Sequence, residues 1–383
     1  MLPLAYSTNL HPAESSGEIA AALVRFAGPL RAELGWERLG LDLRLGSQAL
    51  RGDLTALRRV LDAQRLSAHT LNGFPLRPFQ VVRVKEDAYL PDWSEPERLA
   101  DSLRLLAAAL VLSDEPELTI STSPGSFQPF GAQRNDRRIF AGALGSWAAA
   151  AARLHRQSGR TVILCPEPEP WCSLETSWDV AAFWSGPLAV EGLAACAAGL
   201  DGDRAAARAA LDRHLGVCVD TCHLSLAWED QVAAVARMRA AGARIAKCQV
   251  SAAPQADARD PAQVAALAAM HEPRFLHQTS ASDASGSLAR VVDLDRLGEA
   301  LARLPGATAL RSHFHVPIDA PQLGNGLATT AADSRLGLAA CLAASCPHLA
   351  VETYTWPLLA ADEAAHRAGT RRELATLAGW VQG

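Results

Sequence analysis

The sequence predicts an α/β protein built as a single (β/α)8 TIM barrel, and two observations lead to this prediction. Short apolar, β-prone segments alternate with helix-forming segments along most of the 383-residue chain, as in parallel sheets with crossover helices. Six β-prone segments also lead into polar residues, and such barrels gather their chemistry at the carboxyl ends of their strands. These six are YSTN at 6–9, CPEPEP at 165–170, VDTCH at 219–223, KCQVS at 247–251, SHFHVP at 312–317 and VETYTW at 351–356.

Eight barrel strands are expected. In chain order they lie at residues 4–8, 39–45, 66–71, 118–122, 161–166, 216–220, 244–250 and 349–353. Helices between them begin with recognisable caps, namely Ser15 followed by Glu18, and Ser94 followed by Glu97 with Pro96 in the first turn. The apolar region 141–154 is too short for a bilayer, and we interpret it as an Ala-rich amphipathic helix outside the barrel.

Two connections are longer than ordinary loops between strand and helix. Residues 72–93 are rich in aromatic residues and proline, and we interpret them as a lid whose walls are Phe74, Phe79, Tyr89 and Trp93. The alternative is an ordered packing loop without ligand contact. Residues 252–348 contain two further β-like pieces, 275–280 and 309–317, which form either an inserted hairpin or a barrel strand missing from the count. Because no linker or repeat divides the chain, residues 1–383 are expected to form one domain.

The charge balance favours a small molecule as the partner. The formal net charge is −5 and the isoelectric point is near 6.1, so no broad cationic field attracts nucleic acid. No secretory leader or membrane-spanning segment is recognised, and a cytoplasmic location is expected. The oligomeric state is not indicated. The eight cysteines show no paired spacing and are expected to be buried thiols, although Cys222, between Asp220 and His223, is also a candidate ligand or nucleophile.

Acidic residues at the strand ends are the main candidates for chemistry. Glu167 and Glu169 are two residues apart, so on an extended segment both point to one side, and one could bind a metal while the other acts as a base. Asp220 ends an apolar strand and His223 follows three residues later, which lets both reach one metal-bound substrate. A helix cap and a hydrogen-bonded core histidine are the structural alternatives.

Gln249 and Glu352 complete an oxygen-rich set at the same barrel mouth. Carboxylates with an amide oxygen suit Mg²⁺ or Mn²⁺, whereas added histidines shift the preference toward Mn²⁺, Co²⁺ or Zn²⁺. His313 and His315 share one side of an extended piece and either coordinate, shuttle protons, or form core hydrogen bonds. Further candidates for substrate contacts or alternative ligands are Asn9, His69, Phe74 and Trp93.

The motifs VDTCH and EPEP resemble those of the xylose isomerase-like TIM-barrel superfamily, which includes sugar isomerases, ketose epimerases and the AP-endonuclease IV type. The segments YSTNLHP, TLNGFP, VKEDAYLPDW, CPEPEP, VDTCH, KCQVS, FLHQ, HFHVP and VETYTW together resemble the EboE-type metabolite-traffic proteins across nearly the whole chain. The superfamily resemblance implies a metal held by Glu167, Asp220 and Glu352. Gln249 stands where the superfamily has a histidine, which implies a weaker ligand or completion of the shell by His313 or His315. His223 matches a histidine that contacts substrate.

The resemblance implies a metal-dependent isomerase or epimerase for a small hydroxy-carbonyl metabolite. In that reading Glu167 and Glu352 exchange a proton and His223 orients an oxygen. The EboE-type likeness implies a second reading, a non-catalytic protein that binds a prenyl-derived precursor in an Ebo-type metabolite-traffic pathway. A phosphodiesterase of the AP-endonuclease IV type is a remote third reading, which the acidic charge of the chain disfavours.

Overall fold

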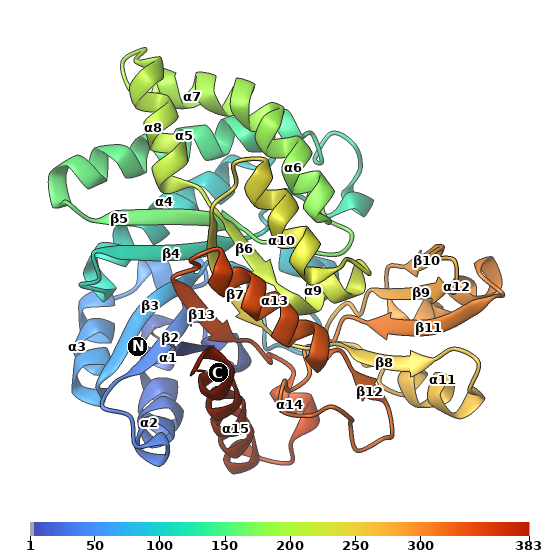
Figure 1. Cartoon of the computed structure of the whole chain (residues 1–383). Coiled ribbons are helices and arrows are strands. Elements are labelled where there is room, and N and C mark those ends of the chain that lie inside the picture. Colours follow the sequence, from blue (N-terminus) through green and yellow to red (C-terminus); the bar gives the residue numbers. More distant parts are fainter. Residues whose placement is uncertain (1–3, 383) are drawn as a thin grey trace.

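A computed structural model describes residues 4–382, and its centre is an eight-stranded parallel sheet curled into a nearly closed barrel (Figure 1). The hydrogen-bonded order is β5-β4-β3-β2-β1-β13-β7-β6, and a parallel bridge between Leu164 and Leu215 joins the two ends. The predicted barrel and all eight expected strands are therefore confirmed. The strands are β1 (Leu4–Ser7), β2 (Leu39–Arg44), β3 (Leu66–Asn72), β4 (Glu117–Thr122), β5 (Thr161–Pro166), β6 (Val217–Asp220), β7 (Ile245–Val250) and β13 (His348–Val351).

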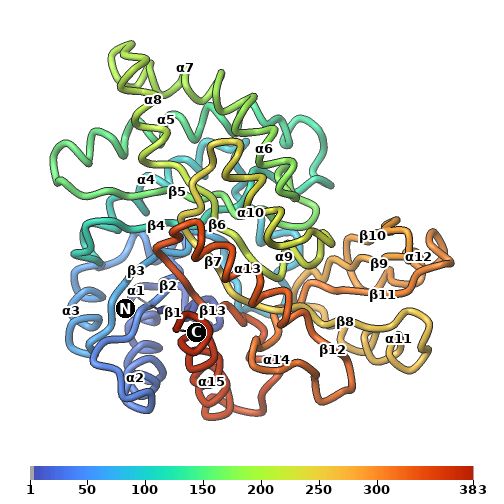
Figure 2. Tube along the Cα trace, viewed as in Figure 1, coloured from blue at the N-terminus to red at the C-terminus, as the bar shows by residue number. Residues whose placement is uncertain are grey.

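Helices surround the barrel, and apolar side chains fill the layer between helices and strands. The first and last described segments, β1 and α15, lie side by side, as the trace in Figure 2 shows. The helices of this ring and of its loops are α1 (Ser16–Ala22), α2 (Gly28–Leu34), α3 (Leu54–Gln64), α4 (Pro96–Leu112), α5 (Arg137–Ser158), α6 (Ser177–Ser185), α7 (Leu193–Ala198), α8 (Arg204–His214), α9 (Thr221–Leu226), α10 (Gln231–Ala240), α13 (Ala331–Ala343), α14 (Trp356–Leu359) and α15 (Glu363–Gln382).

One of the two predicted helix caps is confirmed and the other is shifted. Ser15 caps α1 in a complete capping box with Glu18. By contrast, α4 begins at Pro96 with Glu95 as the N-cap residue, and no side chain caps it. Ser94 instead donates from both its backbone N–H and its hydroxyl to Asp92. Ser94, which the sequence pattern predicted as a helix cap, therefore stabilises the turn at Asp92 instead.

The long connection before the last strand forms a second sheet rather than a hairpin. Its five antiparallel strands are ordered β10-β9-β11-β8-β12, and it projects to one side of the barrel with its own apolar core (Figure 1). Ser312 is the last residue of β11 in this sheet and residues 313–317 follow it, so the prediction of 312–317 as a barrel strand end is wrong. The elements are β8 (Pro254–Asp257), α11 (Pro261–Ala268), β9 (Thr279–Asp283), β10 (Leu288–Val291), α12 (Leu297–Arg303), β11 (Ala307–Ser312) and β12 (Ala328–Thr329).

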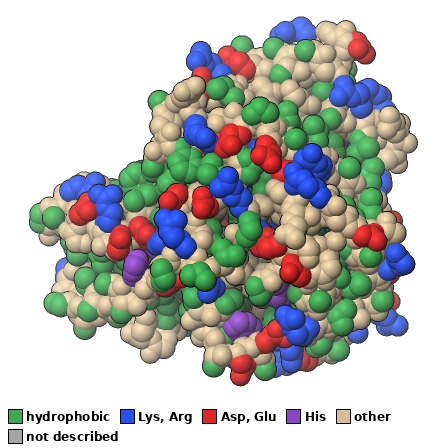
Figure 3. All heavy atoms as spheres, turned by 180° about the vertical axis from the view of Figure 1, so that it is seen from behind, with side chains coloured by type: hydrophobic (Ala, Val, Ile, Leu, Met, Phe, Trp, Pro, Cys, Tyr) green, Lys and Arg blue, Asp and Glu red, His purple; other side chains and the backbone are tan. Residues whose placement is uncertain are grey.

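The distribution of charged side chains and the state of the cysteines match what the sequence predicts. Lys and Arg side chains are interspersed with Asp and Glu over the face drawn in Figure 3. All eight cysteines are free and buried. Within residues 4–382, no single helix has the length and apolar character needed to cross a membrane. The bent pair Ser177–Ser185 and Leu188–Ala198 meets that criterion only when both halves are taken together.

A fully buried ion pair lies inside the barrel. The Lys247 ammonium on β7 donates to the Asp42 carboxylate on β2 and to the Ser121 hydroxyl on β4, both at 2.8 Å. Burial by itself lowers the pKa of Lys247, but Asp42 and other nearby acidic groups outweigh it and raise that pKa above its ordinary value. The lysine is therefore charged, and it joins three strands across the barrel interior.

Replacing Lys247 by methionine should reduce the free energy of unfolding by about 3–5 kcal/mol, because Asp42 would stay buried without its partner. Chemical denaturation followed by circular dichroism measures the loss. The double variant Asp42→Leu/Lys247→Met should regain most of the stability, since it removes both charges. If the double variant is no more stable than Lys247→Met, the ion pair is not the source of the effect.

Buried neutral histidines should make the protein less stable in mild acid. Burial, reinforced by Arg25, lowers the pKa of His11 to about 3, and burial next to His69 lowers the pKa of His348 to about 3. The unfolded chain takes up protons below about pH 6.5, whereas the folded chain does not. Stability is therefore retained above that pH and falls as the pH decreases, by about 2 kcal/mol per histidine at pH 5. Thermal melts across pH 5–8 measure the trend, which the exposed His271→Gln variant should leave unchanged.

Candidate functional site

A partly covered cavity lies at the carboxyl ends of the barrel strands. Its volume is about 60 Å³, which is room for only a few water molecules. Its polar lining comes from the barrel loops and from the residues after β11, and its apolar lining comes from the 72–93 connection and the second sheet. The lining residues are Asn9, Phe74, Pro75, Phe79, Val84, Lys85, Ala88, Tyr89, Glu167, Glu169, His223, Phe275, Leu276, His313, His315, Glu352 and Tyr354.

Two glutamates are joined by one amide at the base of this cavity. Glu167 follows β5, Glu352 follows β13, and the Gln249 side-chain nitrogen on β7 donates to both carboxylates, at 3.2 Å to Glu167. The Gln249 oxygen faces the other way and accepts a hydrogen bond from the Cys218 thiol at 3.0 Å. Gln249 therefore presents a donor to the glutamates, so the predicted role of its oxygen as a metal ligand does not match this orientation.

Glu352 is the most heavily hydrogen-bonded carboxylate of the site. Its Oε1 accepts from the Asn9 side chain at 2.6 Å, and from Ser7 and Asn72 at 3.3 Å each. Burial raises the pKa of Glu352 well above its ordinary value, and Asp220 adds to this effect. Burial also raises the pKa of Glu167, with Glu352 as the next contributor. Since like charges are crowded here, the cluster favours bound protons or a cation.

Asp220 is both a strand end and a helix cap. Its Oδ1 accepts from the backbone N–H of Cys222 at 2.7 Å and of His223 at 3.1 Å, which starts α9 directly after β6. Ser251, at the end of β7, donates to the same oxygen at 3.1 Å. The cap therefore explains locally why the VDTCH segment places His223 beside the carboxylates. The Nδ1 atom of His223 lies 3.7 Å from Glu167 Oε1.

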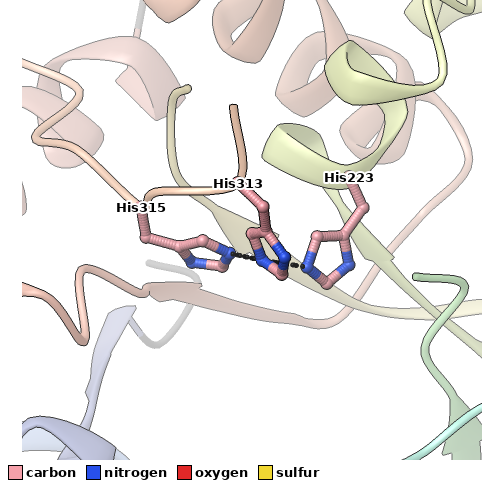
Figure 4. A group of neighbouring side chains, drawn as sticks. All are labelled: His223, His313 and His315. Carbon is pink, nitrogen blue, oxygen red and sulfur yellow. Dashed lines mark hydrogen bonds between the residues drawn. The ribbon is translucent and has the colours of Figure 1, made fainter. Parts of the chain in front are cut away.

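Three histidines converge next to these carboxylates (Figure 4). The Nε2 atom of His313 lies 3.1 Å from Nε2 of His223 and 3.1 Å from Nε2 of His315. Burial lowers the pKa of all three, to about 4 for His315 and well below the ordinary value for His313. The structure thus brings together His223 from the barrel and two residues that follow β11 of the second sheet.

Glu169 lies on the same wall but has a different environment from Glu167. Its Oε1 accepts a hydrogen bond from Tyr89 at 2.8 Å, and its Oε2 is buried without a hydrogen-bond partner among the described residues. Burial raises the pKa of Glu169 to about 8, an effect that the Tyr89 hydrogen bond partly opposes. A carboxyl group with such a pKa and a free oxygen can exchange a proton with a bound molecule near neutral pH.

The chemistry of the side chains fits a divalent metal ion. Three groups place one ligand atom per residue within 4.8 Å of one another: His223, His313 and His315; Asp220, Cys222 and His315; and Glu167, Asp220 and His223. Imidazole and carboxylate are ordinary ligands for such ions. Of the residues predicted from the strand ends, Glu167, Asp220 and His223 are thus close enough together to share one ion, whereas Glu352 belongs to none of these three groups.

Two predicted site residues do not reach the cavity. His69 lies on β3, where its Nδ1 faces Glu115 at 3.4 Å, and Glu115 precedes β4 at the opposite end of the barrel. Trp93 is buried behind the site, with its indole N–H bonded to the Ser123 carbonyl at 3.0 Å and its ring 5.5 Å from that of Phe140. Both side chains serve the packing of the barrel and its helices.

The 72–93 connection, predicted to be a lid, lines the cavity. Phe74, Phe79 and Tyr89 of this connection form part of the cavity wall, together with Phe275 and Tyr354, which no sequence motif indicated. The Gln80 side chain donates to the Asn9 carbonyl at 2.9 Å and to the Tyr354 carbonyl at 3.1 Å. The lid is therefore fastened to the barrel mouth, and its aromatic side chains make the upper part of the cavity apolar.

The 72–93 lid is also fastened to the second sheet. The backbone N–H groups of Val84 and Lys85 both donate to the Arg274 carbonyl, at 2.7 and 2.8 Å. The Lys85 ammonium forms an ion pair with Asp293 at 2.6 Å. Opening of these contacts would enlarge the cavity on the side of the second sheet.

The sequence matches no protein-family model and no curated protein. Solved structures share the fold. An L-ribulose 3-epimerase superposes with a TM-score of 0.50 at 13% identity, over 100% of this chain and 95% of that chain. A D-allulose 3-epimerase from Methylomonas sp. gives a TM-score of 0.49 at 12% identity, over 99% and 98%.

A xylose isomerase-like TIM barrel/4-hydroxyphenylpyruvate dioxygenase fusion protein gives a TM-score of 0.47 at 12% identity, over 98% of this chain but only 42% of that chain. Together with the eight parallel strands, the comparison with the L-ribulose 3-epimerase shows that this chain has the (β/α)8 TIM-barrel fold. At these identities the likeness concerns the fold alone.

Replacing Gln80 by alanine should loosen the lid. Loss of its two hydrogen bonds to the barrel mouth should cost about 1–2 kcal/mol of local stability, so amides of residues 77–90 should exchange about 5–30 times faster. Hydrogen–deuterium exchange with mass spectrometry measures this. Arg77→Ala, which removes only an exposed ion pair with Asp87, is the control. Unchanged exchange in Gln80→Ala would show that the lid is held by other contacts.

Proposed function

We propose that this protein is a metal-dependent isomerase or epimerase acting on a small hydroxy-carbonyl metabolite. The observation that carries the proposal is the pair Glu167 and Glu352, which approach one another through the Gln249 amide inside a covered cavity. A metal-binding group of side chains adjoins them. Two carboxylates with raised pKa values suit a reaction in which a proton leaves a carbon and returns to it.

The two glutamates differ in how they are held, which suggests different roles. Glu352 accepts three further hydrogen bonds, from Ser7, Asn9 and Asn72, and these favour its ionised form. Glu167 accepts fewer and lies 3.7 Å from the His223 ring. We assign Glu352 as the base that removes the proton and Glu167 as the group that returns it.

A bound divalent ion would supply Lewis acidity that polarises a carbonyl oxygen. The three histidines His223, His313 and His315 could hold it, and Asp220 and Glu167 belong to neighbouring groups that could also offer ligands. Mn²⁺, Co²⁺ and Zn²⁺ fit such a mixed set, and Mg²⁺ fits only its oxygen ligands. The 72–93 lid would keep water away from the reacting carbon while it is deprotonated.

A second candidate function is a non-catalytic metabolite-binding protein, and the apolar upper wall of the cavity favours it. Phe79, Phe275 and Tyr354 pack against one another, with ring centroids 4.8–5.3 Å apart. Such a wall suits a ligand with a hydrocarbon part, such as the prenyl-derived precursor that an Ebo-type metabolite-traffic pathway would handle. If such a ligand binds at the mouth and remains unconverted, this second function is supported; if it is converted, the first is.

The Glu352→Gln variant should lose proton exchange with the substrate by about 10²–10⁴-fold while remaining folded. Incubation of candidate ketoses and other hydroxy-carbonyl compounds in D2O, with Mn²⁺, Mg²⁺, Zn²⁺ or Co²⁺, lets NMR detect deuterium entering the carbon beside the carbonyl. Glu97→Gln, on the exposed face of α4, is the matched control and should behave like the unmodified protein. Deuterium entry at an undiminished rate in Glu352→Gln would disprove its role as the base.

A further inference from the structure

We infer that His223, His313 and His315 form a three-histidine metal centre, which holds one transition-metal ion through the three Nε2 atoms. This centre differs from the set of Glu167, Asp220, Gln249 and Glu352 that the sequence resemblance implies. The inference rests on the proposed function only in that both require a divalent ion at this cavity.

The spacing of the nitrogen atoms is the first support. The Nε2 atom of His313 lies 3.1 Å from each of the other two Nε2 atoms (Figure 4). Metal–nitrogen bonds of about 2.0–2.1 Å with angles between 90° and 109° place neighbouring ligand nitrogens roughly 2.8–3.4 Å apart. Two of the three nitrogen pairs are thus already at the separation that coordination of one ion requires, and one ligand atom from each of the three rings lies within 4.8 Å of the others.

The outer nitrogens of two rings fix which nitrogen carries the proton. His223 Nδ1 lies 2.9 Å from the Pro168 carbonyl oxygen, and His315 Nδ1 lies 2.8 Å from the Glu352 carbonyl oxygen. A carbonyl oxygen only accepts hydrogen bonds, so each Nδ1 must carry a proton. Each Nε2 is then a bare lone pair, which is the form of histidine that binds metals.

A chain of hydrogen bonds fixes the third ring in the same way. His313 Nδ1 lies 2.7 Å from Gln278 Oε1, and the Gln278 nitrogen donates to the Tyr89 hydroxyl at 2.7 Å. Tyr89 in turn donates to Glu169 at 2.8 Å. We call this chain of hydrogen bonds, from Glu169 through Tyr89 and Gln278 to His313, the relay. Because Tyr89 gives its proton to Glu169, it must accept from the Gln278 nitrogen, so the Gln278 oxygen faces His313. His313 therefore donates from Nδ1, and its Nε2 carries no proton.

Three bare lone pairs at this separation need a positive charge between them. Neutral rings in these tautomers would repel one another at 3.1 Å, since no Nε2 atom has a proton to donate. One added proton would form a hydrogen bond across only one of the two 3.1 Å contacts, which leaves the other pair of nitrogens without a donor. A metal ion satisfies all three nitrogens at once.

The neighbouring carboxylates lie on the other side of these rings. Glu167 Oε1 is 3.7 Å from His223 Nδ1, while Glu352 Oε2 and Asp220 Oδ2 are 3.8 and 4.0 Å from His315 Nδ1. All three of these distances are measured to the protonated nitrogens rather than to the Nε2 atoms. The carboxylates can therefore support the rings and handle protons while the histidines hold the ion.

The donor set indicates the class of ion. Three imidazoles favour Zn²⁺, Co²⁺, Ni²⁺ or Fe²⁺ over Mg²⁺ and Ca²⁺, which prefer oxygen ligands. Three protein ligands leave a coordination position open, and all three histidines line the cavity, so a substrate oxygen can approach. Since His313 and His315 follow β11, the ion would also fasten the second sheet to the barrel.

Metal binding by purified protein and variants tests the centre. After removal of metal with a chelator, each protein is loaded with Zn²⁺ or Co²⁺, and the bound metal is counted by elemental analysis. Absorption of the Co²⁺ form reports the ligand field. The unmodified protein should bind one ion per chain with a raised melting temperature. His313→Ala and His223→Ala should each lose at least 100-fold in affinity, whereas Glu167→Gln should keep the ion.

The relay offers a finer test with a matched control. Tyr89→Phe removes the hydroxyl that orients Gln278, so the metal affinity should fall about 10–100-fold while the three ligands remain. Tyr354→Phe also removes a buried tyrosine hydroxyl near the histidines, but that hydroxyl is outside the relay, so the affinity should be retained. If His313→Ala does not fold, His313→Gln and the Tyr89→Phe comparison still decide the question.

Several outcomes would overturn the centre. These are no bound ion in the loaded unmodified protein, full retention in the His313 variants, or equal loss in Glu167→Gln. The results also separate this inference from the proposed function. A stoichiometric ion held by the histidines without any turnover would refute the isomerase and leave the centre intact. Metal-dependent turnover, together with full metal affinity in the His223 and His313 variants, would refute the three-histidine centre and leave the proposed isomerase intact.

Discussion

The Lys247–Asp42 ion pair is the interaction on which the interior of the barrel depends. Both side chains are fully buried, and they meet across the barrel interior at 2.8 Å. An unpaired charge in that position would be too costly to retain, so each side chain requires the other. The same lysine counters the crowded glutamates, because its charge opposes the rise in the pKa values of Glu167 and Glu352. The acidic cluster at the mouth is thus tolerated partly because of a cation beneath it.

The segments above the barrel mouth set the surroundings of the carboxylates and histidines. The 72–93 lid and the second sheet enclose the carboxylates and histidines, and their aromatic side chains replace water on one side. Buried polar groups need hydrogen-bond partners, which explains the dense hydrogen bonding around the buried Glu352. The same burial leaves Glu169 Oε2, which has no such partner among the described residues, available for a bound molecule.

Gln249 is the residue that distinguishes this site from the pattern its motifs resemble. As an amide it donates to Glu167 and Glu352 and holds them near one another, whereas a histidine there could bind an ion. The imidazoles near the carboxylates come instead from α9 and from the end of β11. The proposed arrangement therefore separates proton transfer by glutamates from metal binding by histidines.

The barrel could be predicted from the amino-acid sequence, because the alternation of strands with helices and the apolar runs are local properties of the chain. The grouping of Glu167, Asp220, His223 and Glu352 at one mouth could also be predicted, since the carboxyl ends of parallel strands share an edge. The placement of residues 312–317 at the end of a second sheet could not, because the antiparallel pairing of β8 to β12 depends on contacts between segments far apart in the chain.

The same limit applies to single side chains. The relay from Glu169 through Tyr89 and Gln278 to His313 joins four distant segments, and no spacing in the sequence encodes it. His69 lies on a barrel strand, as predicted, but its side chain faces Glu115 at the end of the barrel opposite the cavity. Local chemistry names the residues that can act, and long-range packing decides which of their atoms face one another.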